Sequence, residues 1–219
     1  MIGLLKKDLY VLFHAYHKNF LFITVLYCAL ALFSPKISFV LYFLCWIAGF
    51  YIVSSITIDN SCKWDLYAAG LPLKKSHVAG AKFLLVVITL AAFSLFCCLL
   101  FGILSLFQPI SFLESLMTMA IILPLILIYF GITLALSYKV GPEKARTFML
   151  ILLVIVAVLF FFSAQSGFFD NLVQNPAVQS FFASDAPSAL FYGVEWGAGL
   201  VIYLICWLAG THAYSHKEF

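Results

Sequence analysis

Long runs of apolar residues are the feature that most restricts how this chain can fold. One run, Val78 to Phe107, contains Lys82 as its single charged residue. A helix needs about 20 apolar residues to cross the hydrocarbon core of a bilayer, whereas a barrel strand needs about 10 and alternates apolar with polar positions. The runs are too long for strands and do not alternate. The pattern therefore predicts an all-α integral membrane protein.

The composition excludes a soluble globular domain. Hydrophobic residues make up 65% of the chain and charged residues 10%, whereas soluble domains carry about 25% charged residues. A length of 219 residues leaves room for about six spans joined by short loops. Residues 1–219 are therefore predicted to form a single transmembrane domain, and the net charge of +3 is interpreted as an orientation signal rather than a nucleic-acid footprint.

The predicted boundaries divide the chain into an N-terminal helix, six spans and two longer connections. Residues 1–18 repeat apolar side chains every 3.6 positions with lysines and histidines between them, which predicts an amphipathic helix lying in the membrane plane. Residues 59–77 form one polar connection, and residues 163–189 form the longest non-spanning segment. The six spans are predicted at about 20–33, 37–58, 78–107, 112–137, 147–162 and 190–214.

The distribution of basic residues predicts the orientation. Eleven of the twelve Lys and Arg residues fall on the N-terminal segment, the polar stretch from Asp59 to Lys82, the polar loop after the fourth span, and the C-terminal tail. Only Lys36 falls on the opposite side. The positive-inside rule then places both termini and both polar loops of this multi-pass membrane protein in the cytoplasm.

The connection between the second and third spans is longer than a turn requires. Asp59 or Ser61 is predicted to cap a short helix, with Asp65 in its first turn, where a negative charge favours the helix dipole. Gly70 is predicted to end this helix, and Ser76 to cap the next one. The segment therefore predicts a short amphipathic helix that binds a soluble partner on the cytoplasmic side.

The residues predicted to contact this partner come from both cytoplasmic loops and combine basic with aromatic side chains. They are Asp59, Lys63, Trp64, Asp65, Tyr67, Leu71 and Lys74 in the first loop and Lys139, Lys144 and Arg146 in the second.

The chain lacks sequence patterns for catalysis. No glycine is followed by lysine, so no phosphate-binding loop is present, and no residues are predicted to be catalytic or to bind a metal or cofactor. Energy for transport is therefore predicted to come from a separate protein.

Four residues of the membrane region leave alternatives open. Pro124 predicts either a hinge or a locally accommodated kink in the fourth span. Glu195 either faces an external vestibule or marks a later start of the sixth span, and an ion-driven carrier requires it to be buried and paired. Phe168 and Phe169 either line a path for an apolar cargo or face lipid.

The chain resembles the short permeases of ABC-2 type transporters, in particular those of peptide and antibiotic export. The resemblance rests on the amphipathic start Gly3-Leu-Leu-Lys-Lys-Asp-Leu-Tyr10, on six spans, and on Lys63-Trp-Asp-Leu-Tyr67 followed by Leu71-Pro-Leu-Lys-Lys-Ser-His-Val78 and Lys82. It implies two permease subunits, identical or different, and two ATP-binding-cassette subunits that bind ATP and Mg²⁺.

The same resemblance implies a role for each part of the chain. The helix between spans two and three is expected to be a coupling helix against the ATPase, and residues 1–18 a connecting helix along the inner leaflet. Residues 163–189 are expected to lie near the exit of a hydrophobic or amphipathic cargo, such as an antimicrobial or cytolytic peptide. The alternative is a membrane scaffold or assembly protein whose cytoplasmic loop binds another partner.

Overall fold

The protein is a bundle of long helices in the computed structural model, which describes residues 2–33, 42–70, 74–107, 111–165 and 185–216. These residues contain helices and short connections but no strand, as the apolar runs predict. The helices are α1 (Ile2–Phe33), α2 (Tyr42–Ser61), α3 (Trp64–Ala69), α4 (Lys75–Phe107), α5 (Phe112–Val140), α6 (Pro142–Gln165) and α9 (Asp185–Ser215).

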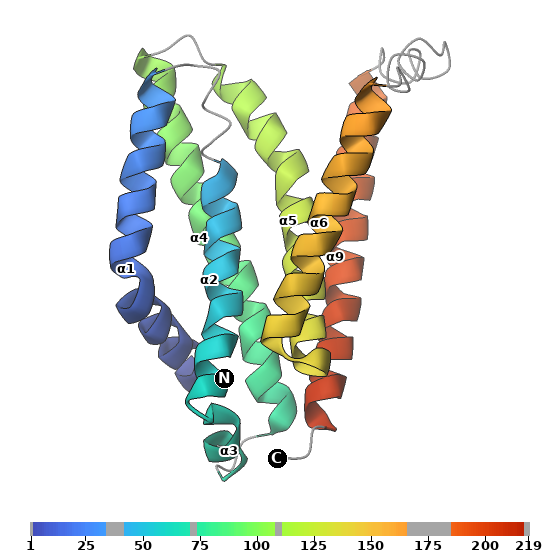
Figure 1. Ribbon diagram of the computed structural model, residues 1–219. Coiled ribbons are helices and arrows are strands. Elements are labelled where there is room, and N and C mark those ends of the chain that lie inside the picture. Colours follow the sequence, from blue (N-terminus) through green and yellow to red (C-terminus); the bar gives the residue numbers. More distant parts are fainter. Residues whose placement is uncertain (1, 34–41, 71–73, 108–110, 166–184, 217–219) are drawn as a thin grey trace.

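Five helices of the described part, namely α2, α4, α5, α6 and α9, are long and apolar enough to cross a membrane. They correspond to the last five predicted spans. The predicted in-plane helix and first span both fall within α1, which changes direction between an oblique N-terminal part and an upright C-terminal part (Figure 1). The apolar stretch 20–33 is shorter than the roughly 20 residues of a full span. A sixth span and an in-plane segment therefore remain predictions.

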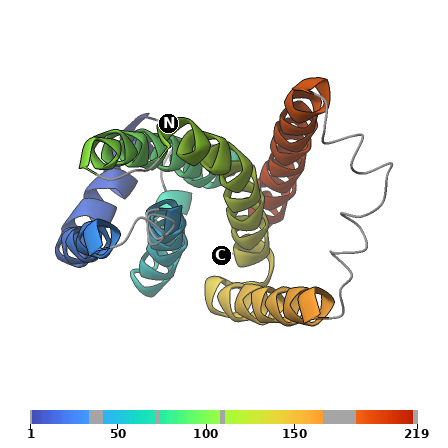
Figure 2. The same ribbon diagram turned by 90° about the horizontal axis from the view of Figure 1, so that it is seen from above.

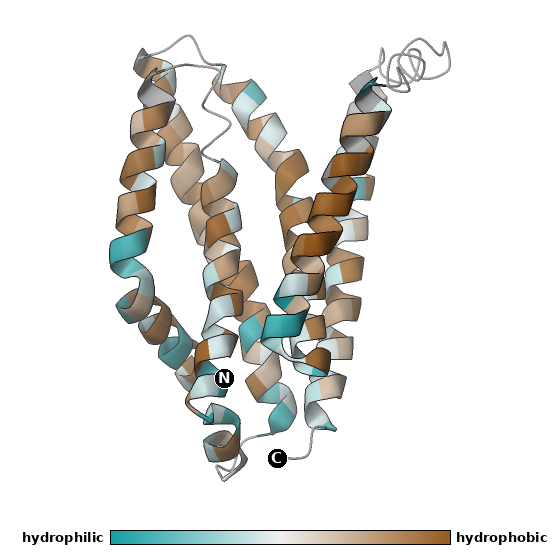
Figure 3. Cartoon of the chain, viewed as in Figure 1, coloured by the Kyte–Doolittle hydropathy of each residue, from teal (hydrophilic) through white to brown (hydrophobic). Residues whose placement is uncertain are grey.

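Helix α5 lies at the centre of the arrangement and packs against α2, α4, α6 and α9. Viewed along the bundle, α1 stands beside α2 and α4 at one edge, whereas α6 and α9 diverge at the other (Figure 2). The N-terminal part of α1, the short α3, the α5–α6 connection and the end of α9 all lie at the same end of the bundle (Figure 1). Polar residues gather towards this end, and the helices are mostly apolar along the rest of their length (Figure 3).

An aromatic cluster holds α2 against α5. The Phe130 ring of α5 lies 5.7 Å from Trp46 and 5.6 Å from Phe50, centroid to centroid. Gly49 of α2 leaves the space that this ring occupies, because a Cβ at position 49 would overlap the Phe130 side chain. The approach of the two helices therefore depends on glycine at this position.

Pro124 interrupts the hydrogen bonding of α5, and α9 compensates for it. Proline has no N–H to donate to the carbonyl four residues earlier, which leaves the Ala120 oxygen without its helical donor. The indole Nε1 of Trp196 donates to that oxygen at 3.0 Å. Gly199 of α9 packs on Pro124, where an added Cβ would lie 3.1 Å from the proline Cβ. Both contacts are of the kind expected for a locally accommodated kink, and a hinge at Pro124 stays a prediction.

The predicted helix caps around α3 are wrong. Helix α2 runs through Ser61, so that Asp59 lies inside it and the Ser61 hydroxyl donates back to the carbonyl of Ile58. The chain then reverses at Lys63, whose φ of 51° is left-handed, and α3 begins without a side-chain cap. A two-residue turn connects α2 to α3. Asp59 does not cap α3, because its carboxylate is engaged elsewhere.

Of the other predictions for the helix ends in this region, the one for Ser76 is wrong and those for Asp65 and Gly70 are confirmed. Helix α4 begins at Lys75, which places Ser76 inside the helix instead of at its cap. Asp65 does lie in the first turn of α3, and Gly70 does follow its last residue, with the glycine N–H donating to the carbonyl of Tyr67 at 3.1 Å.

Replacing Trp196 by Phe should destabilise the packing of α5 on α9. The variant keeps an aromatic ring but leaves the Ala120 carbonyl without a donor, which costs about 1 kcal/mol for a hydrogen bond inside a membrane protein. Thermal unfolding in detergent measures the loss. Trp207→Phe is the matched control, because an aromatic ring remains to stack on Phe83. Equal stability of the two variants would contradict this account of Pro124.

Candidate functional site

Four charged side chains from three helices meet at the polar end of the bundle. Lys7 and Asp8 belong to α1, Asp59 to α2 and Lys82 to α4. The Lys82 ammonium lies 2.8 Å from Asp8 Oδ1 and 2.7 Å from Asp59 Oδ2. The Lys7 ammonium lies 2.7 Å from Asp59 Oδ1 and 3.0 Å from Asp8 Oδ1. We call these four residues the charge cluster.

The charge cluster is largely removed from solvent. The side chains of Asp8 and Lys82 are 4% and 6% exposed, that of Asp59 is 10% exposed, and only Lys7 reaches 25%. Lys82 also donates to the Ser55 hydroxyl at 2.9 Å. Two positive and two negative groups balance, which is the condition under which buried charges are tolerated.

Two contacts attach α3 to this cluster and to α9. The Lys7 ammonium lies 4.1 Å from the centroid of the Trp64 ring, in a cation–π arrangement. The Tyr214 hydroxyl of α9 donates to Asp65 Oδ1 at 3.0 Å, and the Tyr214 ring meets the Tyr138 ring of α5 edge-on at 5.2 Å. The inner face of α3 is thus connected to α1, α9 and, through Tyr214, to α5.

The inner face of α3 is closely packed, whereas its outer face is open. A cavity of about 20 Å³ lies between α3 and the bundle, which is room for one water molecule. Ala68 is 5% exposed on the inner side. Leu66 and Tyr67 are 54% and 64% exposed, and Lys63 beside them is also exposed. A six-residue helix held on one face therefore presents an apolar and basic surface on the other.

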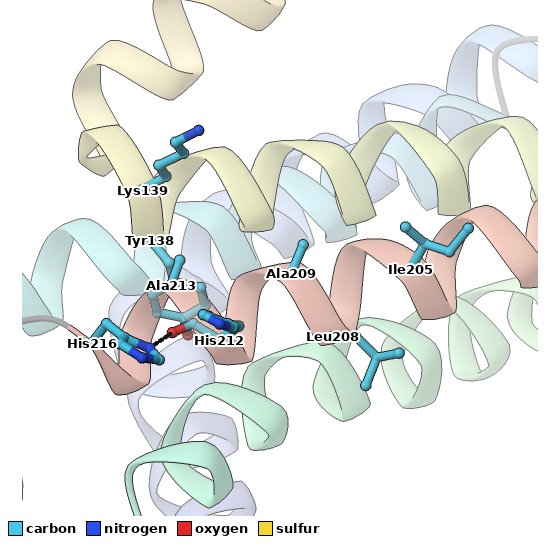
Figure 4. A pocket seen from close by; sticks show the side chains of 8 residues that line it. All are labelled: Tyr138, Lys139, Ile205, Leu208, Ala209, His212, Ala213 and His216. Carbon is cyan, nitrogen blue, oxygen red and sulfur yellow. Dashed lines mark hydrogen bonds between the residues drawn. The ribbon is translucent and has the colours of Figure 1, made fainter.

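A second group of polar side chains lies at the same end of the bundle. Tyr138 and Lys139 at the end of α5, together with His212 and His216 at the end of α9, line an open cavity of about 870 Å³ (Figure 4). The two imidazole rings stack with centroids 4.3 Å apart, and His216 Nδ1 lies 3.0 Å from the carbonyl oxygen of His212. The remaining lining is apolar and includes Leu208.

The residues predicted to contact a partner divide into a group turned towards the bundle and a group exposed to solvent. Trp64 and Asp65 are half-buried and turned towards the bundle by the contacts above. The prediction that Asp59 contacts a partner does not fit its position, because its carboxylate is buried in ion pairs with Lys7 and Lys82. Leu71 lies outside the described residues. The predicted contact residues that are exposed at this end are Lys63, Tyr67, Lys74, Lys139, Lys144 and Arg146.

The residues predicted for a hinge or a cargo path do not come together. Pro124 is buried at the contact of α5 with α9. Glu195 is half-buried in α9, and its buried Oε2 has no hydrogen-bond partner among the described residues. The pairing that an ion-driven carrier requires at Glu195 is therefore not seen in this part of the chain. Phe168 and Phe169 lie outside the described residues.

Sequence reasoning missed most of the charge cluster and the tyrosine that holds α3. Asp8 is the first acidic residue of the chain and lies in a basic amphipathic segment, and Lys82 interrupts a long apolar run. A single charge in such surroundings is a signal for a buried partner of opposite sign. That signal predicts pairing but not which residues pair. Tyr214 carried no signal, since tyrosines are frequent near the ends of membrane helices.

Comparison with known families gives one match. The sequence model of a family described as ABC-2 family transporter protein matches residues 3–215. Neither the comparison with curated proteins nor that with solved structures gives a match.

Replacing Lys82 by Met should be strongly destabilising. The substitution leaves Asp8 and Asp59 buried with Lys7 as their only cation in the charge cluster, and breaking a buried ion pair costs about 3–5 kcal/mol. The double variant Asp8→Asn/Lys82→Met removes one charge of each sign and should recover most of the loss. Unfolding in detergent measures both, with exposed Lys74→Met as control. If Lys82→Met is as stable as Lys74→Met, the cluster does not stabilise the bundle.

Proposed function

Because the chain belongs to the ABC-2 transporter family, we propose that it is the membrane-spanning permease subunit of an ATP-binding-cassette exporter. It carries an amphipathic or hydrophobic cargo, such as an antimicrobial or cytolytic peptide, out of a bacterial cell across the plasma membrane. ATP and Mg²⁺ bind to a separate ATPase subunit. The observation that carries the proposal is α3, which is attached to the bundle by its inner face and exposes Leu66 and Tyr67 on its outer face.

The ATPase subunit docks on this outer face in the proposed complex. Family members of this type typically pair with such a subunit. The exposed basic residues Lys74, Lys139, Lys144 and Arg146 belong to the same end of the bundle and give the surface a positive rim. An exposed aromatic and aliphatic pair within a charged rim is the usual composition of a protein interface. Two ATPase subunits and a second permease, identical or different, complete the exporter.

The polar end of the bundle faces the cytoplasm in this proposal. The N-terminal part of α1, with Lys6 and Lys7, and both polar connections with their basic residues share that end, which agrees with the positive-inside rule. Both termini are then cytoplasmic, as is α3. Residues 163–189 are on the external side, where the cargo leaves.

The contacts of α3 define how a movement of the ATPase reaches the membrane helices. Helices α2 and α4 are joined to α3 through the chain, but α1 and α9 are joined to it through Lys7 on Trp64 and Tyr214 on Asp65. A displacement of α3 therefore acts on four long helices. The ATPase must bind α3 differently in its ATP-bound and ATP-free states, since only a difference in binding free energy shifts a conformational equilibrium.

Removing the outer face of α3 should release the partner. Leu66→Ala/Tyr67→Ala deletes two exposed side chains, of which Tyr67 also meets the Trp64 ring at 5.4 Å, and is expected to weaken ATPase binding at least tenfold. Tagged protein is purified in mild detergent from its native cells, and ATPase activity in the eluate is measured. Tyr10→Ala is the control, because Tyr10 is also exposed (71%) but belongs to α1. A wild-type protein that purifies alone, without ATPase, would instead favour the scaffold function.

Removing a single hydroxyl should prevent the movement of α3 from reaching α9 without preventing the partner from binding. Tyr214→Phe deletes the donor to Asp65, so the ATPase still binds to α3 but its displacement no longer reaches α9. Nitroxide labels at exposed Cys62 and at Gly197→Cys, in a background without the other five cysteines, report the distance between the turn that leads into α3 and α9. ATP with vanadate should change this distance in the wild-type complex, and the variant should lose most of the change. An unchanged response in Tyr214→Phe contradicts transmission through this bond.

A further inference from the structure

A groove runs along α1 on the side that faces α2 and α4. Its volume is about 400 Å³, within the range of small-molecule sites. Aromatic and aliphatic side chains form nearly all of its surface, among them Leu12, Phe13 and Phe20 of α1, Ala48 of α2 and Phe93 of α4. Helix α1 stands at the outer edge of the bundle (Figure 2), so that the groove lies between a peripheral helix and the helices behind it.

The middle of the groove carries ionisable nitrogen. His17 lines the groove, and its ring stacks on Phe13 at 5.6 Å and meets the His14 ring at 6.5 Å. His17 Nδ1 lies 2.9 Å from the carbonyl oxygen of Phe13, which leaves Nε2 for a ligand. Lys18 follows and is exposed. None of the described residues that line the groove is acidic.

A polar atom without a partner lies deeper in the groove. Thr24 is two turns beyond His17 on α1, and its hydroxyl oxygen is buried with no hydrogen-bond partner among the described residues. A buried hydroxyl that bonds to nothing is costly. A ligand with a carbonyl oxygen at this depth would accept its hydrogen bond. From its middle at His17 towards Val25, the groove thus offers basic side chains, a single hydroxyl donor and an apolar wall.

We propose that this groove holds one acyl chain of an anionic phospholipid. The phosphate lies beside His17 and Lys18, an ester carbonyl accepts from Thr24, and the chain follows the apolar wall formed by α1, α2 and α4. Charge complementarity selects this occupant, since His17 lines the groove, the exposed Lys18 follows it, and none of the described lining residues is acidic. The proposal rests on the multi-pass membrane location alone and does not depend on an ATPase partner.

A lipid in this position would help to hold α1 against α2 and α4. Leu9 and Leu12 line the groove within the first turn after Asp8 of the charge cluster, so the same helix is fixed by ion pairs below and by the lipid above. Loss of the lipid would leave the upright part of α1 with an unfilled contact to α2 and α4.

Competitive lipid binding tests the proposal. Protein purified in detergent is supplied with equimolar phosphatidylglycerol and phosphatidylcholine and analysed by native mass spectrometry. The wild type should retain one phosphatidylglycerol in preference. His17→Gln/Lys18→Gln should lower phosphatidylglycerol affinity at least about fivefold, the effect expected from loss of the Lys18 charge alone at a membrane surface, with no change for phosphatidylcholine. Lys144→Gln, an exposed lysine of α6, is the matched control and should have no effect.

A second variant tests the groove itself. Thr24→Phe removes the hydroxyl and fills the groove, and should reduce retention of both lipids. Val154→Phe, on the exposed apolar side of α6, should retain them as the wild type does. The proposal is overturned if Lys144→Gln lowers phosphatidylglycerol retention as much as the double variant does, because the lipid is then bound only as part of the general lipid surround. It is also overturned if neither the double variant nor Thr24→Phe changes retention.

Discussion

The balance of charge in the cluster of Lys7, Asp8, Asp59 and Lys82 is the constraint on which the polar end of this protein depends. On their own, α2 and α4 would each carry an unpaired charge, Asp59 and Lys82, into a bundle whose remaining core is apolar, whereas α1 brings the pair Lys7 and Asp8. Such a charge is far too costly to bury alone, and it becomes tolerable only when the three helices meet. The ion pairs therefore fix the position of α1 along its axis relative to α2 and α4.

The same cluster connects the membrane helices to α3. Lys7 takes part both in the ion pairs and in the contact with Trp64, so the attachment of α3 depends on α1 being correctly placed. On the other side, Asp65 accepts from Tyr214 of α9. A helix of only six residues has little stability of its own. These side-chain contacts, together with the short chain connections, keep it in a fixed orientation and leave its outer face free to bind a partner.

Much of the fold could be predicted, because it follows from local properties of the chain. The length and continuity of the apolar runs indicated membrane helices, and Gly70 correctly marked the end of α3. The N-terminal boundaries of α3 and α4 were less accurate, since a left-handed turn at Lys63 replaced the expected cap. Of the candidate site, the exposed Tyr67 was predicted. The inward position of Asp59 was not, because it depends on Lys7 and Lys82, which lie far from it in sequence.

The sequence by itself determined the class of the protein, its membrane location and the basic bias of one side, since hydropathy and charge are properties of single residues and their neighbours. Only the tertiary structure decided which charges neutralise one another, which donor satisfies the carbonyl freed by Pro124, and which face of α3 remains exposed. Each of these outcomes depends on distances between separate helices. Periodicity along one helix does not contain that information, because many helix arrangements bury the same apolar faces.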